Sequence, residues 1–145
     1  MIIRLATAGD AAAMAALESG HPTAAGWGKA GFETEFNQPG AVIFVADEGG
    51  RVCGFICGRM LPPEIQVLNM AVSEGCLRKG LATRLLNELF KRGRAAGCAV
   101  ATLEVRKSNE PAQCCYLKAG FKIVGIRPKF YNGTEDAVLM DAPLI

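Results

Sequence analysis

The chain has 145 residues, and half of them are apolar, which is sufficient for one compact domain with a real core. Its formal net charge of +2 at pH 7 is too small to indicate a general nucleic-acid or membrane binder. No stretch approaches the roughly 20 apolar residues that span a bilayer, and the N-terminus lacks the apolar region and cleavage site of a secretory signal. We therefore expect a single cytoplasmic domain over residues 1–145.

The six cysteines do not show the paired CxxC spacing that is typical of a zinc site. Their neighbours are apolar or strand-like, so we expect reduced, mostly buried thiols and no bound metal. A disulfide framework is the alternative, but a core of this size does not need crosslinks and the cytoplasm would reduce them. The cysteines are Cys53, Cys57, Cys76, Cys98, Cys114 and Cys115.

The first part of the chain predicts a strand and two helices. Residues 2–6 are expected to form the strand, and Thr7 with Asp10 three residues later resembles a capping box that opens a helix. Phe32 and Phe36 recur at helical spacing before a Pro-Gly pair, which predicts a short second helix behind a loop rich in Gly, Pro and Ala.

The middle of the chain predicts three consecutive strands, at residues 41–47, 51–61 and 65–72. Glu48-Gly49-Gly50 separates the first two, and its glycines permit the positive φ angles of a tight hairpin. Consecutive strands with such short connections favour an antiparallel meander.

The last part of the chain predicts two helices and three strands. A helix begins near Gly80 and ends near Gly97, because five apolar side chains between them share one helical face. These side chains are Leu81, Leu85, Leu86, Leu89 and Phe90. After it we expect a strand at 99–105, a helix from Pro111 to Ala119, and strands at 121–127 and 137–140. The whole pattern predicts a mixed α/β (α+β) domain.

The third strand of the meander runs into a basic, glycine-containing loop that opens a helix. The first N–H groups of a helix lack intrahelical partners and carry the positive end of its dipole, so they favour an anion. Gly80 and Ala82 leave little side chain to obstruct a pyrophosphate, and Arg78 and Lys79 add positive charge. By themselves these residues equally allow an ordinary connection with solvated basic side chains.

This loop resembles the acetyl-coenzyme A signature of the GNAT acetyltransferase superfamily: Gln or Arg, two variable residues, then Gly-x-Gly or Gly-x-Ala. The matching residues are Leu77-Arg78-Lys79-Gly80-Leu81-Ala82, preceded by Asn69-Met70-Ala71-Val72. Leu77 departs from the pattern because Gln or Arg is usual there. The resemblance implies the GNAT fold, a central, mostly antiparallel sheet flanked by helices, in the order strand, two helices, three strands, helix, strand, helix and two strands.

A further likeness, to the bacterial ribosomal-protein alanine N-acetyltransferase subgroup, covers residues 65 to 140. The residues that carry it are Leu103-Glu104-Val105-Arg106-Lys107-Ser108-Asn109, Ala112, Tyr116-Leu117, Gly120-Phe121, Arg127, Tyr131 and residues 135–140. Two departures concern the selection of an acceptor. The Trp27-Gly28-Lys29 segment lacks the Pro-Trp-Ser sequence often seen there, and the loop after Tyr131 is short.

The resemblance also implies roles for individual residues. It makes acetyl-coenzyme A the cosubstrate, entering between the strands at 65–72 and 99–105, with Glu104 as general base and Tyr116 as general acid. The residues implied to bind acetyl-coenzyme A are Met70, Ala71, Val72, Arg78, Lys79, Gly80, Leu81, Ala82, Thr83 and Asn109.

Amine chemistry explains why these residue types suit the reaction. Only a neutral amine attacks a thioester. An α-amine has a pKa of about 8, whereas the pKa of a lysine side chain is about 2.4 units higher, so its deprotonation costs about 3 kcal/mol more. Glu104 could accept the amine's proton directly or through one water, and Tyr116 could protonate the departing thiolate. Read alone, Glu104 is equally a salt-bridged surface carboxylate and Tyr116 a packed core residue. A route through Cys114 or Cys115 is the alternative to direct attack.

The expected acceptor is the N-terminal amine of a protein, of the ribosomal-protein alanine type. The alternatives are acetylation of lysine, a polyamine or a small metabolite, which an acidic groove with room only for a small amine would favour, and a noncatalytic acyl-coenzyme A sensor. We expect no direct contact with nucleic acid or a membrane, and the sequence leaves the oligomeric state open. His21 is interpreted as a loop residue, and Trp27 as a packing residue that could line an acceptor groove.

Overall fold

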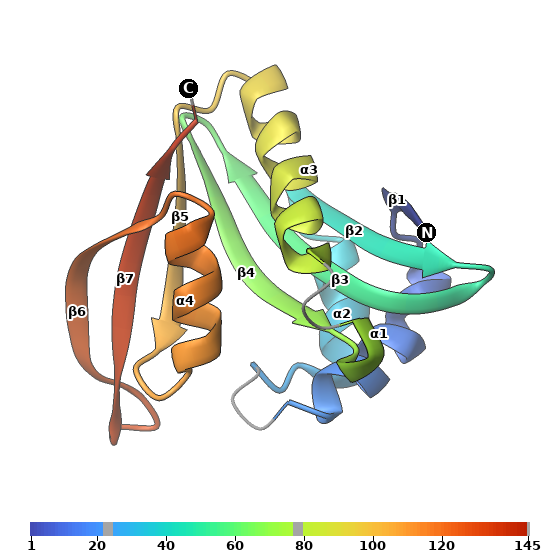
Figure 1. Cartoon of the computed structure of the whole chain (residues 1–145), viewed down its shortest axis with the longest axis horizontal. Coiled ribbons are helices and arrows are strands. Elements are labelled where there is room, and N and C mark those ends of the chain that lie inside the picture. The colour runs from blue at the N-terminus through green and yellow to red at the C-terminus, as the bar shows by residue number, and fades with distance from the viewer. Residues whose placement is uncertain (22–24, 77–79, 145) are drawn as a thin grey trace.

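The computed structural model describes residues 1–21, 25–76 and 80–144 and shows a seven-stranded sheet with helices on both faces (Figure 1). The elements are β1 (Ile2–Leu5), α1 (Ala11–Ser19), α2 (Gly28–Phe36), β2 (Ala41–Glu48), β3 (Arg51–Leu61), β4 (Glu64–Val72), α3 (Leu81–Ala95), β5 (Val100–Arg106), α4 (Glu110–Lys118), β6 (Lys122–Tyr131) and β7 (Glu135–Pro143). The strands lie in the order β1-β2-β3-β4-β5-β7-β6. β4 and β5 are parallel, and the other neighbouring pairs are antiparallel.

Each helix and strand predicted from the sequence is confirmed, and the differences concern the ends. The backbone N–H of Thr7 donates to the Asp10 carboxylate at 2.8 Å, as a capping box requires, but a 3₁₀ turn precedes α1. β6 extends to Tyr131 and β7 begins at Glu135, well beyond the predicted strands. The reason is that these two strands continue to pair through residues without an apolar pattern.

Helices α3 and α4 cover one face of the sheet, and α1 and α2 cover the opposite face (Figure 1). The predicted apolar face of α3 is buried in the larger core: Leu85, Leu86 and Leu89 are 0% exposed. Burying one such side chain stabilises the fold by about 1.5–3 kcal/mol before the cost in entropy. Phe90 contacts Phe121 with ring centroids 5.8 Å apart, so this core also reaches the C-terminal strands.

The smaller core lies under α1 and α2 and is partly aromatic. Phe32 of α2 meets Phe55 of β3 edge to face at 5.1 Å and Trp27 at 5.4 Å, and Met14 of α1 is fully buried beside them. The prediction that Trp27 packs is therefore confirmed. This core attaches the chain that enters α2 to the sheet.

Four of the six cysteines are buried and none is in a disulfide in this structure, so the prediction that most of them are buried is confirmed. Cys114 is exposed and Cys115 half-buried on α4. Within the described residues, no helix combines the length and the apolar character that crossing a membrane requires.

A β-bulge in β4 determines where the sheet opens. Cys57 of β3 pairs with Asn69 and Gly58 pairs with Val67, so Leu68 is an extra residue without a partner. On the other side of β4, the parallel pairing with β5 runs from Glu64 only as far as Val67. A bulge bends the strand that contains it, and β4 and β5 diverge beyond this point (Figure 1).

The bulge also changes which face the following side chains occupy. Val67 and Met70 both belong to the core under α3, although three positions separate them and strict alternation would place them on opposite faces. Asn69 and Ala71 instead face the layer formed by α1 and α2. The extra residue thus turns Asn69 towards α1.

Gly58 tests the close packing of α3 at the bulge. A Cβ atom there would lie 2.7 Å from Leu89 Cδ1 and 3.1 Å from the carbonyl oxygen of Gln66. We expect Gly58→Ala to lower the free energy of unfolding by about 1–3 kcal/mol, because overpacking forces neighbours to move. Gly75→Ala is the matched control, since a Cβ there meets nothing within 4 Å. Urea denaturation measures both, and equal midpoints would contradict this packing.

Candidate active site

The candidate site begins where β4 and β5 stop pairing. A cavity of about 90 Å³ lies between the separated strands, and it adjoins a groove of about 630 Å³. The groove runs along the face of β4, β5, β6 and β7 opposite α4. The residues that line both spaces are Ala25, Val67, Leu68, Glu104 and Tyr131. The two spaces therefore meet at Glu104.

Four of the residues predicted for the site line the small cavity. Met70 comes from β4, Glu104 from β5, Asn109 from the start of α4 and Tyr116 from the middle of α4. They are brought together because α4 follows β5 after three residues and because Tyr116 belongs to the same core as Met70. The two proposed catalytic side chains thus share one cavity.

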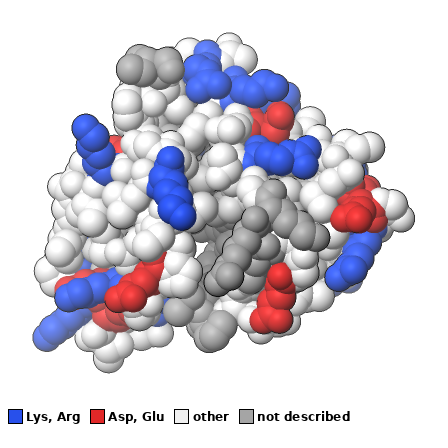
Figure 2. All heavy atoms as spheres, viewed as in Figure 1, with Lys and Arg blue, Asp and Glu red and all other residues white. Residues whose placement is uncertain are grey.

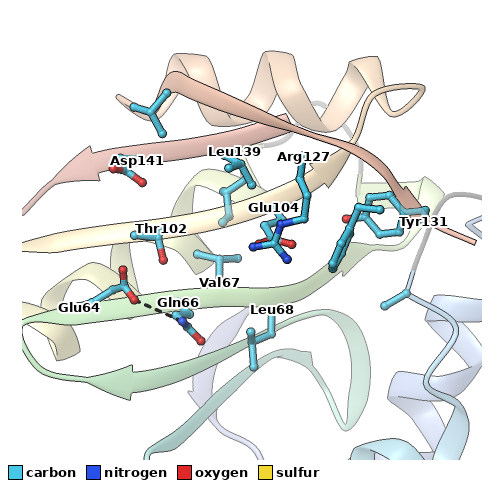
Figure 3. A pocket seen from close by; sticks show the side chains of 14 residues that line it. Glu64, Gln66, Val67, Leu68, Thr102, Glu104, Arg127, Tyr131, Leu139 and Asp141 are labelled. Atoms are coloured by element: carbon cyan, nitrogen blue, oxygen red, sulfur yellow. Dashed lines mark hydrogen bonds and ion pairs between the residues drawn. The ribbon is translucent and has the colours of Figure 1, made fainter. Parts of the chain in front are cut away.

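Glu104 makes an ion pair across the groove. Its Oε1 lies 3.0 Å from Nη2 of Arg127, and the two side chains are 33% and 52% exposed. The Arg127 guanidinium also lies over the Phe130 ring, 4.6 Å from its centroid. Figure 3 shows Arg127 extending from β6 towards Glu104, with Tyr131 beside them. The carboxylate is held in place and remains accessible from the groove.

Tyr116 is 8% exposed and packs edge to face against Phe121, 5.6 Å between centroids. Burial raises the pKa of its phenol well above the ordinary value of 10.0. The phenol consequently stays protonated at neutral pH and can donate a hydrogen bond into the cavity. Tyr116 packs in the core and also lines the cavity, so its position is compatible both with a packing role and with a role towards a ligand.

Asn109 has a structural role in addition to its place in the cavity. It is the N-cap of α4, and its Oδ1 accepts a hydrogen bond from the Ala112 backbone N–H at 3.3 Å. A cap of this kind is worth about 1 kcal/mol. The side chain is therefore fixed by the start of the helix.

The remaining predicted cofactor residues lie at the end of β4 and the start of α3. Ala71, Val72 and Leu81 point into the cores, so only their backbone groups can face a ligand. Gly80 is exposed with a φ of 73°, a conformation that favours glycine, while Ala82 is half-buried and Thr83 exposed. Arg78 and Lys79 lie outside the described residues.

The face that carries α3 is basic. Figure 2 shows Lys and Arg side chains over this part of the surface. In the helix itself the one acid is Glu88, and the exposed basic residues are Arg84, Lys91, Arg92 and Arg94. Three of these basic residues lie near the C-terminus of α3, where they complement the helix dipole.

The groove brings in residues that the sequence did not identify. Gln66 of β4, Thr102 of β5 and Asp141 of β7 occupy paired positions across the sheet, and Figure 3 shows their side chains along the groove floor. Thr102 could have been found, because residues two apart in a strand share a face and Glu104 was already a candidate. The contributions of β6 and β7 depend on strand order, which no local pattern reveals.

Two other candidates lie away from these spaces. His21 Nε2 is 3.1 Å from the carbonyl oxygen of Val72, and His21 lines neither the cavity nor the groove. Within the described residues one group could hold a metal, Glu48 with Cys53 and Cys76, whose ligand atoms lie within 4.8 Å of one another. This group also lies outside both spaces.

Comparison with known proteins identifies the family. Residues 12–121 match the model of the acetyltransferase (GNAT) family. The chain is 37% identical over 99 residues to an uncharacterized N-acetyltransferase of Methanocaldococcus jannaschii, a match that covers 68% of this chain and 64% of that protein. It is 33% identical over 104 residues to the [ribosomal protein bS18]-alanine N-acetyltransferase of Escherichia coli, covering 70% of each.

The fold agrees with these sequence matches. The crystal structure of the ribosomal-protein-S18-alanine N-acetyltransferase from Escherichia coli superposes with a TM-score of 0.85 and 28% identity, over 99% of this chain and 93% of that one. The predicted GNAT fold and the likeness to this subgroup are thereby confirmed. The chain belongs to the GNAT family of acetyltransferases.

Proposed function

We propose that this protein transfers the acetyl group of acetyl-coenzyme A to the N-terminal α-amine of a protein, by direct attack of the amine on the thioester. The observation that carries this proposal is the position of Glu104 at the junction of a small cavity and an open groove. A carboxylate there can meet an acceptor that comes along the groove while the thioester occupies the cavity. The relatives named above support an amine acceptor.

The reaction requires two proton transfers. The amine nitrogen attacks the thioester carbonyl carbon, and the ammonium that forms loses its proton to Glu104, directly or through one water. The carbon–sulfur bond then breaks, and the Tyr116 phenol passes its proton to the sulfur of coenzyme A. The proton that Glu104 took from the amine then restores the phenol through water, so both side chains return to their starting states. Because a thiol has a pKa of about 8.5, a hydrogen bond from Tyr116 during bond cleavage also assists the departure. The products are an acetylated amine and free coenzyme A.

Acetyl-coenzyme A is proposed to enter between β4 and β5, with its pyrophosphate at the start of α3. Beyond Val67 the backbone of β4 no longer pairs with β5, so those polar groups of the Met70 to Val72 segment that point away from β3 can bind the acyl end of the ligand. The N-terminus of α3 and Gly80 favour a pyrophosphate, and Arg78 and Lys79 of the same loop add charge.

The groove supports a peptide acceptor over a small amine. Its lining has three carboxylates, Glu64, Glu104 and Asp141, against one guanidinium, Arg127, so it is acidic, which alone would also suit a polyamine. Its volume of about 630 Å³ is far larger than a small amine needs and extends over four strands. A protein N-terminus uses this length, and its lower pKa removes about 3 kcal/mol of the deprotonation cost that a lysine carries. We propose an N-terminal alanine as the preferred residue, by analogy with the Escherichia coli relative, and the cytoplasm as the location.

A screen of acceptors tests this function. N-terminal peptides, matched peptides with a blocked N-terminus and an internal lysine, and polyamines are incubated with acetyl-coenzyme A and read by mass spectrometry. We expect acetylation of free N-termini, with alanine first, and much slower modification of the blocked peptides. Preferential acetylation of lysine or polyamines would replace the proposed acceptor class. Binding of acetyl-coenzyme A without turnover of any amine would indicate a sensor.

Glu104→Gln keeps the shape of the side chain and removes the base. At pH 7 we expect kcat/KM for a peptide α-amine to fall by about a hundredfold to ten-thousandfold, with little change in acetyl-coenzyme A affinity. The defect should shrink as the pH rises past about 8, because the amine then supplies its own neutral form. Pre-steady-state kinetics from about pH 6 to 9.5 measure the profile on both sides of the pKa of the α-amine.

Arg127→Met is the companion variant for Glu104, since it removes the ion pair and leaves the carboxylate. At pH 7 it should lose much less kcat/KM than Glu104→Gln, because the base is still present. A loss in Glu104→Gln that is equal at every pH, with chemistry limiting throughout, would make Glu104 a positioning residue.

Tyr116→Phe deletes one hydroxyl from the cavity and preserves the packing on Phe121. We expect kcat to fall at least about tenfold while the Kd for acetyl-coenzyme A stays near that of the wild type, since the group acts on the leaving sulfur. Cys114→Ala, two residues earlier on the exposed side of α4, is the control and should leave turnover unchanged. Burial raises the pKa of the neighbouring Cys115 thiol, which opposes a nucleophilic role. Normal turnover in Tyr116→Phe would show that Tyr116 has only a packing role.

A further inference from the structure

Glu18, near the C-terminus of α1, is a buried carboxylate that the mechanism does not use. It is 4% exposed. Its Oε1 accepts the Gly28 backbone N–H at 3.0 Å, and its Oε2 accepts the Trp27 backbone N–H at 3.0 Å. These two N–H groups belong to the start of α2, which has no capping side chain of its own. Glu18 therefore caps α2 from another helix, where the dipole favours a negative charge.

The same carboxylate also contacts β4. Oε2 of Glu18 accepts a hydrogen bond from Nδ2 of Asn69 at 2.8 Å, and both side chains are buried. Asn69 faces α1 only because the bulge at Leu68 reverses the alternation of the strand. Asn69 and the following Met70 both line the small cavity. One side chain thus joins two helices to the strand that is proposed to hold the thioester.

The segment that Glu18 fixes forms part of the acceptor side of the site. Ala25 lines both the cavity and the groove, and Trp27 follows two residues later. With Trp27 and Gly28 attached to Glu18 and Glu18 attached to Asn69, the wall of the groove keeps a fixed distance from β4. Such a connection determines where an acceptor amine arrives relative to the thioester.

We propose that Glu18 is a positioning residue for the acceptor, because it attaches the segment entering α2 to the bulged strand β4. This inference rests on the proposed amine acetylation, although the attachment can be measured without turnover. Glu35 provides the comparison. It is an equally buried carboxylate of the same helical layer, 6% exposed, and pairs with Arg59 at 2.6 Å. It lines neither space, so its role in stability is separate from the site.

The test compares Glu18→Gln with Glu35→Gln in the full chain. The Glu18 carboxylate accepts hydrogen bonds from three N–H groups. The NH₂ group of a glutamine cannot accept a hydrogen bond, so at least one of these contacts is lost in Glu18→Gln. We expect kcat/KM for the acceptor to fall by about tenfold to a hundredfold, mainly through KM, with the calorimetric Kd for acetyl-coenzyme A within about twofold of the wild type. Glu35→Gln should lower the free energy of unfolding and leave both kcat/KM for the acceptor and the Kd for acetyl-coenzyme A unchanged.

Trp27, the single tryptophan of the chain, reports the attachment directly. In folded Glu18→Gln its emission should shift to the red and acrylamide should quench it more strongly, whereas Glu35→Gln should match the wild type. If Glu18→Gln does not fold, Asn69→Ala removes the contact to β4 and leaves the cap of α2 in place. It should raise the acceptor KM in the same way without shifting the Trp27 emission.

The possible failures are distinguishable. If the wild type acetylates lysine or small amines instead of N-termini, the proposed acceptor is wrong, and the Glu18 variants are compared on the amine that is used. If acetyl-coenzyme A binds without turnover, the Trp27 emission alone tests whether Glu18 attaches the segment entering α2 to β4. Unchanged emission in Glu18→Gln, or unchanged acceptor kinetics in both Glu18→Gln and Asn69→Ala, would overturn the proposal.

Discussion

The separation of β4 from β5 is the constraint on which the rest of the site depends. Every peptide unit carries a donor and an acceptor that must be satisfied, so an unpaired strand edge inside a sheet is costly unless a ligand or water occupies it. Here the parallel ladder stops at Val67 and Leu103. The cavity beyond that point, the accessibility of Glu104 and the approach of Tyr116 from α4 all follow from this interruption.

Local patterns were sufficient for most of the fold. The apolar face of α3 recurs with the helical period, and Gly97 adopts a φ of 84° just after the helix, where a glycine was expected to end it. The bulge was not predictable in this way. In residues 65–72 the polar residues Gln66 and Asn69 are three positions apart, but a polar residue can lie on either face of a strand whose two faces are both partly covered, so this spacing does not identify Leu68 as the extra residue. Its position is fixed by the partner strand.

In the site, too, some residues could be predicted from the sequence and others could not. Glu104, Tyr116, Met70 and Asn109 lie close to one another along the chain or in a motif, and resemblance to a family selected them. The partners of these residues come from far away in sequence: Arg127 from β6 and, for Asn69, Glu18 at a separation of 51 residues. Periodicity within β5 would have placed Thr102 beside Glu104, but only the strand order brings Asp141 to the same floor.

The interrupted ladder also has a thermodynamic consequence. The strands before and after the opening, β1–β4 and β5–β7, are each held by long antiparallel ladders, while four paired positions and the shared core around Phe90 and Phe121 join the two sets. Any molecule that contacts both sets and binds only the folded chain raises the free energy of unfolding by mass action, by about 2.7 kcal/mol at a hundred times its Kd. Melting temperature therefore becomes a measure of how fully the opening between the two sets of strands is occupied.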